Sequence, residues 1–314
     1  MQNHNQRKTK IIIAGPTASG KSSLAVLLAK KLDGEIISVD SRQCFKRIDI
    51  GTAKPSEEQL QNIPHHNISV LNLQEEDSVA DFKKRSDQYT AEIEDKGKNV
   101  IYCGGSTLHL KSLIQPLDDI PEANPENIQM LNQTAEEKGL EHLFEKLEEA
   151  DPVYAGKMDG LNRQRIIRAL DVWYQTGKPF SSFHSDDPVT LPEEMLFFAL
   201  NHPRNILHNR ISERTDQMIK DGLIDETKQL LKEGFNRDLQ AFNTVGYKQA
   251  IQFLDGEISK DQMIRDIKTA TRRYAKRQIT WLRRWPFVKW MNMHEKTKKE
   301  AVKEILDAYK QSIN

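Results

Sequence analysis

Eight consecutive residues near the N-terminus have the types and spacing of a phosphate-binding loop. They are Gly15, Pro16, Thr17, Ala18, Ser19, Gly20, Lys21 and Ser22, which fit the pattern G-x-x-x-x-G-K-[ST]. Glycines at these positions let backbone N–H groups turn towards an anion, where the dipole of a following helix also favours negative charge. Lys21 adds a positive charge, and the Ser22 hydroxyl can ligate Mg²⁺. The alternative is a tight turn with a buried lysine.

A carboxylate follows the second apolar run of the chain. Asp40 comes directly after Glu35–Val39, so we expect it at the carboxyl edge of a sheet. There it would lie beside the phosphate-binding loop if the two strands are neighbours. Asp40 could then ligate Mg²⁺, act as a general base towards an acceptor substrate, or cap a helix. The spacing supports the first two roles equally.

A basic segment near the C-terminus, residues 265–289, contains nine lysines and arginines and one acid, Asp266. The cations are Arg265, Lys268, Arg272, Arg273, Lys276, Arg277, Arg283, Arg284 and Lys289, and the interleaved aromatic residues are Tyr274, Trp281, Trp285, Phe287 and Trp290. Guanidinium groups can hold RNA phosphates while rings stack on unpaired bases, at about 1–3 kcal/mol per base. Because the cations repel one another, the segment predicts a polyanionic partner. The alternative is an amphipathic helix with tryptophans facing the core, which is the more common fate of Trp281 or Trp290 taken alone.

Two shorter signals carry less weight. Pro64-His65-His66 could suggest a metal site, but adjacent histidines on an extended segment point to opposite sides, and no cysteine or third ligand accompanies them. We therefore expect no metal there. The glycine turn Gly104-Gly105-Ser106-Thr107 follows a third apolar run and could bring backbone amides or the Ser106 hydroxyl to a substrate.

The composition excludes several classes of protein. Lysine and arginine balance aspartate and glutamate at 46 each over 314 residues, so the net charge gives no global sign of a nucleic-acid partner. Cys44 and Cys103 are the only cysteines, too few for a disulfide scaffold or a structural zinc site. No apolar run is as long as a membrane span, and residues 1–8 lack the apolar segment of a signal peptide. We therefore expect a cytoplasmic protein without a membrane partner.

Alternating strand and helix signals in the first third of the chain predict an α/β fold. Three β-type runs alternate with two helical stretches: Lys10–Ala14, Ser23–Leu32, Glu35–Val39, Val79–Lys96 and Asn99–Cys103. Such alternation predicts a parallel sheet with right-handed crossovers and with ligands at the carboxyl ends of its strands. A further buried strand is expected at Met195–Leu200, where the chain would return to the sheet.

The segment before this returning strand is expected to be entirely helical. Prolines at positions 116, 121 and 125 break the preceding pattern, and three helices are expected: Glu126–Lys138, Gly139–Ala150 and Asn162–Thr176. We therefore expect an all-helical insertion domain, residues 117–193, within an α/β core made of residues 1–116 and 194–314. From Asn205 onward, the chain is expected to be helical again.

These motifs together resemble the bacterial tRNA dimethylallyltransferase family. Beside the phosphate-binding loop, the shared motifs are Asp40-Ser41-Arg42-Gln43, Asp49-Ile50-Gly51-Thr52-Ala53-Lys54-Pro55, Pro64-His65-His66, Gln164-Arg165-Ile166-Ile167-Arg168-Ala169-Leu170, Val245-Gly246-Tyr247 and the run from Thr271 to Trp281. They run in consistent order from about residue 10 to residue 290, whereas a P-loop kinase would share only the loop. The resemblance implies a P-loop NTPase-like parallel sheet flanked by helices, with the helical insertion.

The resemblance implies alkyl rather than phosphoryl transfer. Dimethylallyl diphosphate would donate its prenyl group to the exocyclic amine of the adenosine just 3′ of the tRNA anticodon, releasing pyrophosphate. Residues 15–22 would bind the diphosphate, with Mg²⁺ near Ser22, and stabilise the leaving group. Asp40 would accept the proton of the attacking amine. Arg214 would clamp the diphosphate, with Arg210 as the competing assignment.

The resemblance also implies contacts with the tRNA anticodon stem-loop, whose target base would be taken out of the stack into a channel. The expected contact residues are Asp40, Ser41, Arg42, Gln43, Ser106, Gln164, Arg165, Ile166, Ile167, Arg168, Lys276, Arg277, Gln278, Trp281 and Arg283. The helical insertion would close over the RNA. We expect the enzyme to be a monomer.

The chain departs from the family pattern at two places. Where the family usually has Gly-Gly-Thr-Gly-Leu-Tyr, this chain has Gly104-Gly105-Ser106-Thr107-Leu108-His109, and Phe45 after Cys44 stands where a tyrosine is usual. Ser106 keeps a hydroxyl at the first place, so the chemistry of that position is expected to be preserved.

Three alternative functions stay open at this point. An adenylate isopentenyltransferase would use the same donor with a free nucleotide, and it has no need for the insertion or the basic segment. A P-loop ATPase or kinase that binds RNA would hydrolyse a nucleoside triphosphate without forming a prenyl product. An RNA-binding protein with a decayed phosphate loop is disfavoured because Lys21, Ser22 and Asp40 are intact.

Overall fold

The computed structural model describes residues 9–184 and 188–313. The chain divides into two compact units, one made of residues 1–115 and 189–314 and the other of residues 116–188. Within the described ranges, no helix is both long and apolar enough to span a membrane.

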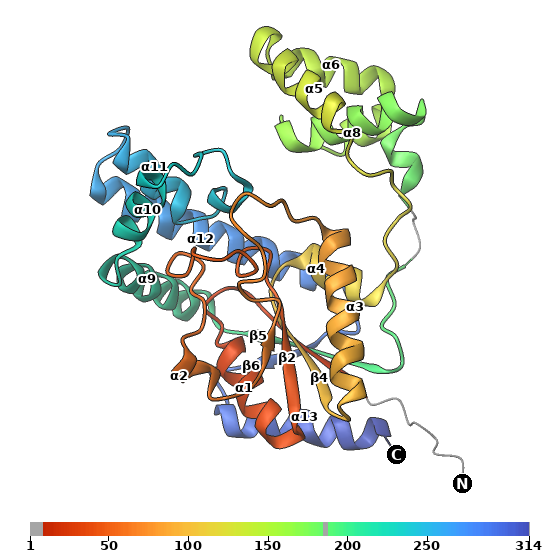
Figure 1. Ribbon diagram of the computed structural model, residues 1–314. Coiled ribbons are helices and arrows are strands. Elements are labelled where there is room, and N and C mark those ends of the chain that lie inside the picture. Colours follow the sequence, from red (N-terminus) through yellow and green to blue (C-terminus); the bar gives the residue numbers. More distant parts are fainter. Residues whose placement is uncertain (1–8, 185–187, 314) are drawn as a thin grey trace. The chain divides into compact units, whose positions relative to one another are not determined.

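A six-stranded parallel sheet forms the centre of the first unit, in the order β3-β2-β4-β1-β5-β6 (Figure 1). The strands are β1 (Lys10–Ala14), β2 (Gly34–Val39), β3 (His65–His66), β4 (Asn99–Gly104), β5 (Met195–Asn201) and β6 (Lys289–Asn292). The α/β prediction is confirmed, and the expected strands β1, β2, β4 and β5 form within one residue of their predicted ends. The chain leaves after β4 and returns at β5, which pairs with β1.

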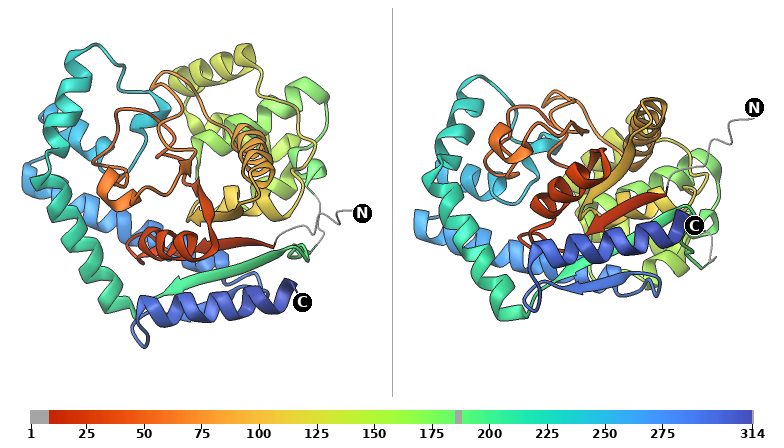
Figure 2. Two further views of the ribbon diagram at one scale, coloured as in Figure 1. Left: turned by 60° about the horizontal axis from the view of Figure 1, so that its bottom comes forward. Right: turned by 90° about the horizontal axis from the view of Figure 1, so that it is seen from below.

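Alternating side chains of the strands bury both faces of this sheet. Ile11 and Ile13 of β1 pack with helices α1 (Lys21–Leu32) and α13 (Lys298–Ile313), and Figure 2 shows α13 running alongside α1 and the sheet. Ile12 and Ala14 face the opposite way and pack with α3 (Val79–Asp95) and α4 (Thr107–Ile114). All the first-unit strands are parallel, so their carboxyl ends and the loops that follow them meet at one edge.

The strand order corrects one expectation about Asp40. We expected it beside the phosphate-binding loop if β1 and β2 were neighbours, but β4 lies between them and pairs with both. Val39 aligns with Gly104 of β4, and Gly104 aligns with Ala14 of β1, so the ends of the three strands are level. Asp40 therefore stays at the same edge as the loop, one strand further away.

A group of helices continues the first unit beyond the sheet (Figure 1). It consists of α9 (Arg204–Lys220), α10 (Leu223–Lys232), the 3₁₀ turn Gln240–Phe242, α11 (Tyr247–Leu254) and α12 (Lys260–Leu282). Phe45, Phe242 and Tyr247 are fully buried at its centre, so the loop after β2 packs into this helical group together with α10 and α11. The same loop carries the single-turn helix α2 (Glu57–Leu60), whose N-cap Ser56 accepts a hydrogen bond from the Gln59 N–H.

We expected the chain after Asn205 to be helical, but it is not helical throughout. Helix α12 ends at Leu282, and Lys289–Asn292 forms strand β6, with Trp290 aligned to Ala199 of β5. Pro286 stands between the two elements, where it cannot donate to a helical hydrogen bond. The end of the chain does form a helix, α13, and Ile305 and Tyr309 on its inner face are buried against the sheet layer.

The second unit is entirely helical among its described residues. Its helices are α5 (Pro125–Lys138), α6 (Leu140–Ala150), α7 (Pro152–Gly156) and α8 (Arg163–Thr176), followed by a 3₁₀ turn, Phe180–Phe183. Leu131, Leu143, Leu147, Ile166 and Leu170 form its core. The Asn124 side chain caps α5, and the buried Asp171 accepts a hydrogen bond from the Asn127 amide, so the start of α5 is tied to α8.

Candidate active site

The phosphate-binding loop has the strand–loop–helix context that its pattern requires. It leaves β1 after Ala14 and enters α1 at Lys21, with Gly20 as N-cap at φ +94° and no hydrogen bond from a capping side chain. Gly15 has φ +143°, and a Cβ there would lie 2.8 Å from the Leu200 carbonyl oxygen of β5. The backbone path therefore depends on glycine at both positions, and it leaves the N-terminus of α1 open to an anion.

Lys21 is held over this loop. Its Nζ donates to the Pro16 carbonyl oxygen at 2.9 Å. Burial lowers the pKa of Lys21 to about 8, and the positive charge of Arg214 lowers it too, whereas Asp40 acts in the opposite direction. A buried cation with this pKa gains from a nearby anion, because the anion restores its preference for the protonated form.

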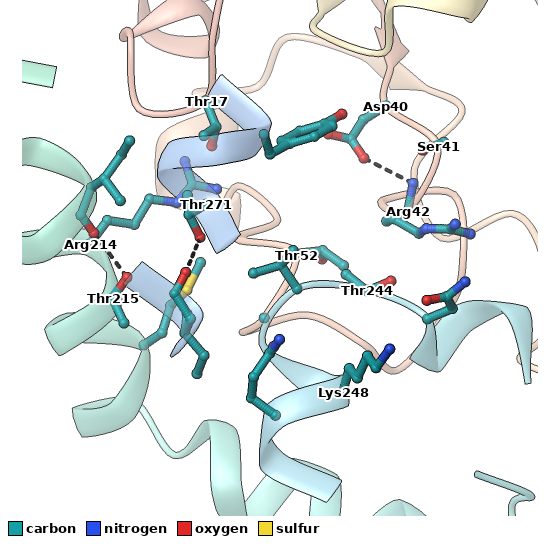
Figure 3. A pocket seen from close by; sticks show the side chains of 18 of the residues that line it. Thr17, Asp40, Ser41, Arg42, Thr52, Arg214, Thr215, Thr244, Lys248 and Thr271 are labelled. Atoms are coloured by element: carbon teal, nitrogen blue, oxygen red, sulfur yellow. Dashed lines mark hydrogen bonds between the residues drawn. The ribbon is translucent and has the colours of Figure 1, made fainter. Parts of the chain in front are cut away.

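A pocket of about 380 Å³ opens beside the loop within the first unit. Its walls come from the phosphate-binding loop, the loop after β2 and helices α9, α11 and α12. The residues that line it are Thr17, Asp40, Ser41, Arg42, Gly51, Thr52, Ile211, Arg214, Thr215, Met218, Asn243, Thr244, Val245, Lys248, Gln249, Ile267, Thr271, Tyr274 and Arg277. Figure 3 shows Thr17, Asp40, Arg42, Arg214 and Lys248 around it.

Asp40 lines the pocket and also caps the turn that follows it. Its Oδ1 accepts a hydrogen bond from the N–H group of Arg42 at 2.9 Å (Figure 3) and another from the N–H group of Gln43 at 3.2 Å. Its Oδ2 has no hydrogen-bond partner among the described residues. The capping role and a role in chemistry are therefore compatible, because one oxygen fixes the carboxylate and the other stays available to a proton or a metal ion.

Arg210 and Arg214 lie one turn apart on α9 but have different surroundings. Arg210 donates from Nε to the Ala18 carbonyl oxygen of the phosphate-binding loop at 2.7 Å. Arg214 lines the pocket and, within residues 9–184 and 188–313, forms neither a salt bridge nor a side-chain hydrogen bond. Burial lowers the pKa of Arg214, with Asp40 opposing that shift. This geometry favours Arg214 as the anion ligand and Arg210 as a brace of the loop.

Several pocket residues are not among the site residues expected from the sequence. Thr52, Thr244, Lys248 and Tyr274 stand within or next to shared motifs, but a motif does not say which of its side chains faces a cavity. Tyr274 packs under Arg277, whose guanidinium carbon lies 5.7 Å from the ring centre, and burial raises the pKa of Tyr274 to about 12. Arg42, Arg214, Lys248 and Arg277 set four cations against the single acid Asp40, so the pocket favours an anion.

Two expected RNA-contact residues in this region have structural roles instead. The Gln43 side-chain amide accepts from Ser38 Oγ at 3.2 Å and donates to the carbonyl oxygens of Thr52 at 3.2 Å and Ala53 at 3.3 Å. Ser106 is buried, and its Oγ accepts from the Ser41 N–H at 3.1 Å. Both side chains therefore hold the pocket walls, while Ser41 and Arg42 line the pocket itself.

The basic segment divides into exposed and internal side chains. Lys276, Arg277 and Arg283 are exposed and form no salt bridge among the described residues, as an RNA-binding face requires. In contrast, Lys268 pairs with Asp216 at 2.6 Å and Arg272 donates to Ser212 at 3.0 Å, so these two cations act within the fold.

Two further expected RNA contacts on α12 have contacts within the fold. Trp281 is half-buried against the sheet core, with its ring centre 5.4 Å from that of the buried Trp285. Gln278 is 3% exposed, and both ends of its amide are bonded to backbone groups. Helical periodicity turns Trp281 and Leu282 towards the sheet, so part of the Trp281 ring packs on the core, as the core-facing alternative expects.

The expected contacts in the second unit divide in the same way. Gln164 and Arg165 are exposed, whereas Ile166 and Ile167 are buried in the core of this unit and cannot present their side chains to RNA. Arg168 pairs with the buried Asp171 at 2.5 Å. The run therefore supplies two surface residues, two core residues and one internal ion pair.

The departures from the family pattern lie in buried positions. His109 is 5% exposed and stacks on Phe82 with ring centres 4.3 Å apart, and burial lowers its pKa to about 4. Phe45 is fully buried among the helices around α11. His109 is thus a neutral core side chain, and neither residue lines the pocket. His66 of β3 pairs with Glu35 near the start of β2 at 2.8 Å.

Hard oxygen ligands suitable for Mg²⁺ are present at the loop. The exposed Ser22 hydroxyl lies in the first turn of α1, and Asp40 has a free carboxylate oxygen at the same sheet edge. Cys103 on the intervening strand touches Ser22, and burial raises the pKa of its thiol to about 11, so it stays a neutral thiol. One hydroxyl and one carboxylate fit a magnesium ion that keeps water and diphosphate oxygens as its other ligands.

Comparisons with known proteins agree with this geometry. Residues 43–285 match the IPP transferase family. The chain is 43% identical over 298 residues to a tRNA dimethylallyltransferase of Carboxydothermus hydrogenoformans, covering 94% of this chain and 96% of that protein. It is similar to a solved tRNA isopentenylpyrophosphate transferase of Bacillus halodurans, with a TM-score of 0.70, 35% identity and coverage of 97% and 98%. A eukaryotic dimethylallyltransferase solved acting on tRNA gives a TM-score of 0.77 and 27% identity, covering 95% of this chain and 78% of that one. The chain therefore belongs to the IPP transferase family.

Proposed function

We propose that this protein transfers a dimethylallyl group from dimethylallyl diphosphate to the exocyclic amine of the adenosine 3′-adjacent to the anticodon in tRNA. The observation that carries the proposal is that one cationic pocket is lined both by the phosphate-binding loop, through Thr17, and by the carboxylate of Asp40. A leaving-group site and a proton acceptor thus face the same space. The names of the relatives support tRNA as the acceptor rather than a free nucleotide.

The loop and Arg214 act on the departing pyrophosphate. As the allylic carbon–oxygen bond breaks, its electron pair goes to the pyrophosphate, whose charge is stabilised by the amides at the start of α1, by Lys21 and by Arg214. The Pro16 carbonyl oxygen holds Lys21 in place before the reaction, and Arg210 braces the loop at the Ala18 carbonyl oxygen. Prearranged donors of this kind cost little reorganisation when charge develops.

Asp40 acts on the acceptor. The nitrogen lone pair of the adenosine amine forms the new carbon–nitrogen bond, and a proton of that nitrogen passes to Oδ2 of Asp40. Its Oδ1 stays fixed by the Arg42 and Gln43 amides during this transfer. When bound, Mg²⁺ held by Ser22 would neutralise part of the diphosphate charge.

The exposed cations bind the RNA. We assign Lys276, Arg277 and Arg283 on and after α12 to phosphates of the anticodon stem-loop, and Gln164 and Arg165 of the helical insertion to the same RNA. These five side chains are exposed. We also propose that the enzyme acts in the cytoplasm, where its tRNA substrate is, and that it is a monomer. Light scattering tests the assembly state, and a dimer or larger species would contradict the proposal.

Incubation with labelled dimethylallyl diphosphate tests the activity. Unmodified tRNA and AMP are offered together with Mg²⁺, and label is expected in the RNA. Label in AMP alone would instead assign a free-nucleotide acceptor, and RNA-stimulated hydrolysis of ATP without a prenyl product would assign an RNA-binding ATPase.

A further inference from the structure

Gln278 joins helix α12 to two loops at the edge of the sheet. Its Oε1 accepts from the Thr17 N–H at 2.9 Å, and its Nε2 donates to the Gly105 carbonyl oxygen at 2.7 Å. Thr17 belongs to the phosphate-binding loop after β1, and Gly105 follows β4. One buried side chain thus connects three segments that are far apart in the sequence.

The orientation of this amide is fixed by its partners. A backbone N–H can only donate and a backbone carbonyl can only accept, so the two ends of the Gln278 amide cannot be exchanged without losing both bonds. A side chain that lacked these atoms would leave a partly buried N–H and a buried carbonyl without their partner, which is costly for the buried group. The site therefore requires a side chain of this length with one acceptor and one donor.

Gly105 packs closely against this side chain. A Cβ added at Gly105 would lie 2.3 Å from Gln278 Nε2 and 2.9 Å from the Gly15 carbonyl oxygen. Position 105 therefore has no room for a side chain, because the Gln278 amide and the phosphate-binding loop both approach it. The glycine and the glutamine form one packing unit that determines where Thr17 lies.

The helix that carries Gln278 also carries the proposed RNA contacts. Lys276 and Arg277 precede it and are exposed, while Tyr274, one turn earlier, lines the pocket. The same turn of α12 thus faces solvent on one side and the phosphate-binding loop on the other. A change in the position of α12 would be passed to Thr17 through Gln278.

We propose that Gln278 is a positioning residue for the diphosphate site rather than an RNA contact. It holds the Thr17 segment in the conformation that binds the leaving group and links that conformation to the RNA-binding helix. The inference rests on the proposed function for the identity of the ligand. Its test uses inorganic pyrophosphate with Mg²⁺, whose binding requires no prenyl transfer.

The main experiment compares two affinities in Gln278→Met, which keeps the approximate shape of the side chain without its hydrogen bonds. Pyrophosphate binding is measured by calorimetry and tRNA binding by filter retention. We expect pyrophosphate affinity to fall about threefold to tenfold, in line with the loss of one or two buried hydrogen bonds, and tRNA affinity to stay within about twofold. In steady-state assays, the KM for dimethylallyl diphosphate should rise while the KM for tRNA does not.

A second variant disturbs the same unit from the other side. Gly105→Ala places a methyl group against Gln278 Nε2 and should also weaken pyrophosphate binding without weakening tRNA binding. Leu282→Ala is the control for general destabilisation, because Leu282 is buried one turn further along α12 in the sheet core. It should lower the Tm and leave pyrophosphate affinity unchanged.

Arg283→Gln is the matched control for RNA contact. It should change the two affinities in the opposite way to Gln278→Met, with weaker tRNA binding and unchanged pyrophosphate binding. The proposal is overturned if Gln278→Met behaves like Arg283→Gln, or if both Gln278→Met and Gly105→Ala bind pyrophosphate as the wild type does. A wild-type protein that binds pyrophosphate but prenylates no RNA would contradict the proposed function alone.

Discussion

The phosphate-binding loop and helix α12 are joined by the hydrogen bond from the Thr17 N–H to the Gln278 side chain. The sequences of the two segments determine their roles in different ways. The loop acts through its backbone, so the order of its glycines largely determines what it does. Helix α12 acts through side chains that point in all directions, so adjacent residues have opposite environments. Lys276 and Arg277 are exposed, and Gln278 is buried.

A loop motif and a basic composition therefore predict different things about a protein. A loop motif specifies a conformation and therefore a ligand class, because few other backbones can follow the same path. A basic composition specifies that a charged face exists but not which residues belong to it. Variants near the loop should consequently change turnover or donor binding, and variants on the exposed face of α12 should change tRNA affinity.

Replacement of the proposed base should give the largest effect. Asp40→Asn keeps an oxygen that can accept from the Arg42 and Gln43 N–H groups but removes the proton acceptor. We expect kcat to fall about 10²- to 10⁴-fold, the usual contribution of general base catalysis, with tRNA affinity within about twofold of wild type. Single-turnover prenyl transfer and tRNA binding measure the two quantities. A large loss of tRNA binding would make Asp40 a positioning residue.

The two arginines of α9 provide a matched pair. Arg214→Gln should lower kcat/KM for dimethylallyl diphosphate about tenfold to a hundredfold, because a charged hydrogen bond contributes about 1.5–3 kcal/mol. Arg210→Gln removes one bond to the Ala18 carbonyl oxygen and should cost less. Steady-state kinetics with saturating tRNA compares them, and the reverse order of effects would assign the clamp to Arg210.

Lys21 should make donor capture depend on pH. Its pKa is lowered to about 8 in the free protein, so the protonated form that attracts diphosphate is present below that pH and is lost as the pH rises through it. We expect kcat/KM for the donor to decline about tenfold per pH unit above this point. A profile that stays flat up to the ordinary lysine pKa of 10.5 would contradict the assignment.

Single cations of the basic segment should give the smallest effects. Lys276→Gln and Arg283→Gln should each weaken tRNA binding a few-fold and reduce the slope of log affinity against log salt by about 0.7. Lys268→Gln is the matched control on the same helix, because Lys268 already pairs with Asp216 at 2.6 Å. Salt titrations of tRNA binding give the slopes, and an equal loss for Lys268→Gln would remove the distinction between exposed and internal cations.

Much of the fold could be predicted because its strands are buried on both faces and contain continuous apolar residues, as β1 and β5 do. Strands β3 and β6 are too short for such a signal, and β6 forms because β5 offers a free edge. The order of the strands depends on long-range pairing, which is why β4 was not expected between β1 and β2.

The candidate site could be predicted where a residue acts through the backbone or ends a strand. The loop and Asp40 belong to this group, and both lie at the pocket. Lys248 and Thr52 reach the pocket only through the packing of α11 and the loop after β2. Ile166 and Gln278 stand within correct motifs but turn inwards, which is decided by tertiary packing rather than by the motif.

The central claim is that one pocket binds a departing pyrophosphate beside a carboxylate that deprotonates an RNA amine. Mass analysis of the adenosine 3′-adjacent to the anticodon, after unmodified tRNA is incubated with dimethylallyl diphosphate and either wild-type protein or Asp40→Asn, tests it most directly. The account predicts one added dimethylallyl group on the exocyclic amine with the wild type and almost none with the variant. An unmodified adenosine with the wild-type protein, or equal modification by both proteins, would contradict it.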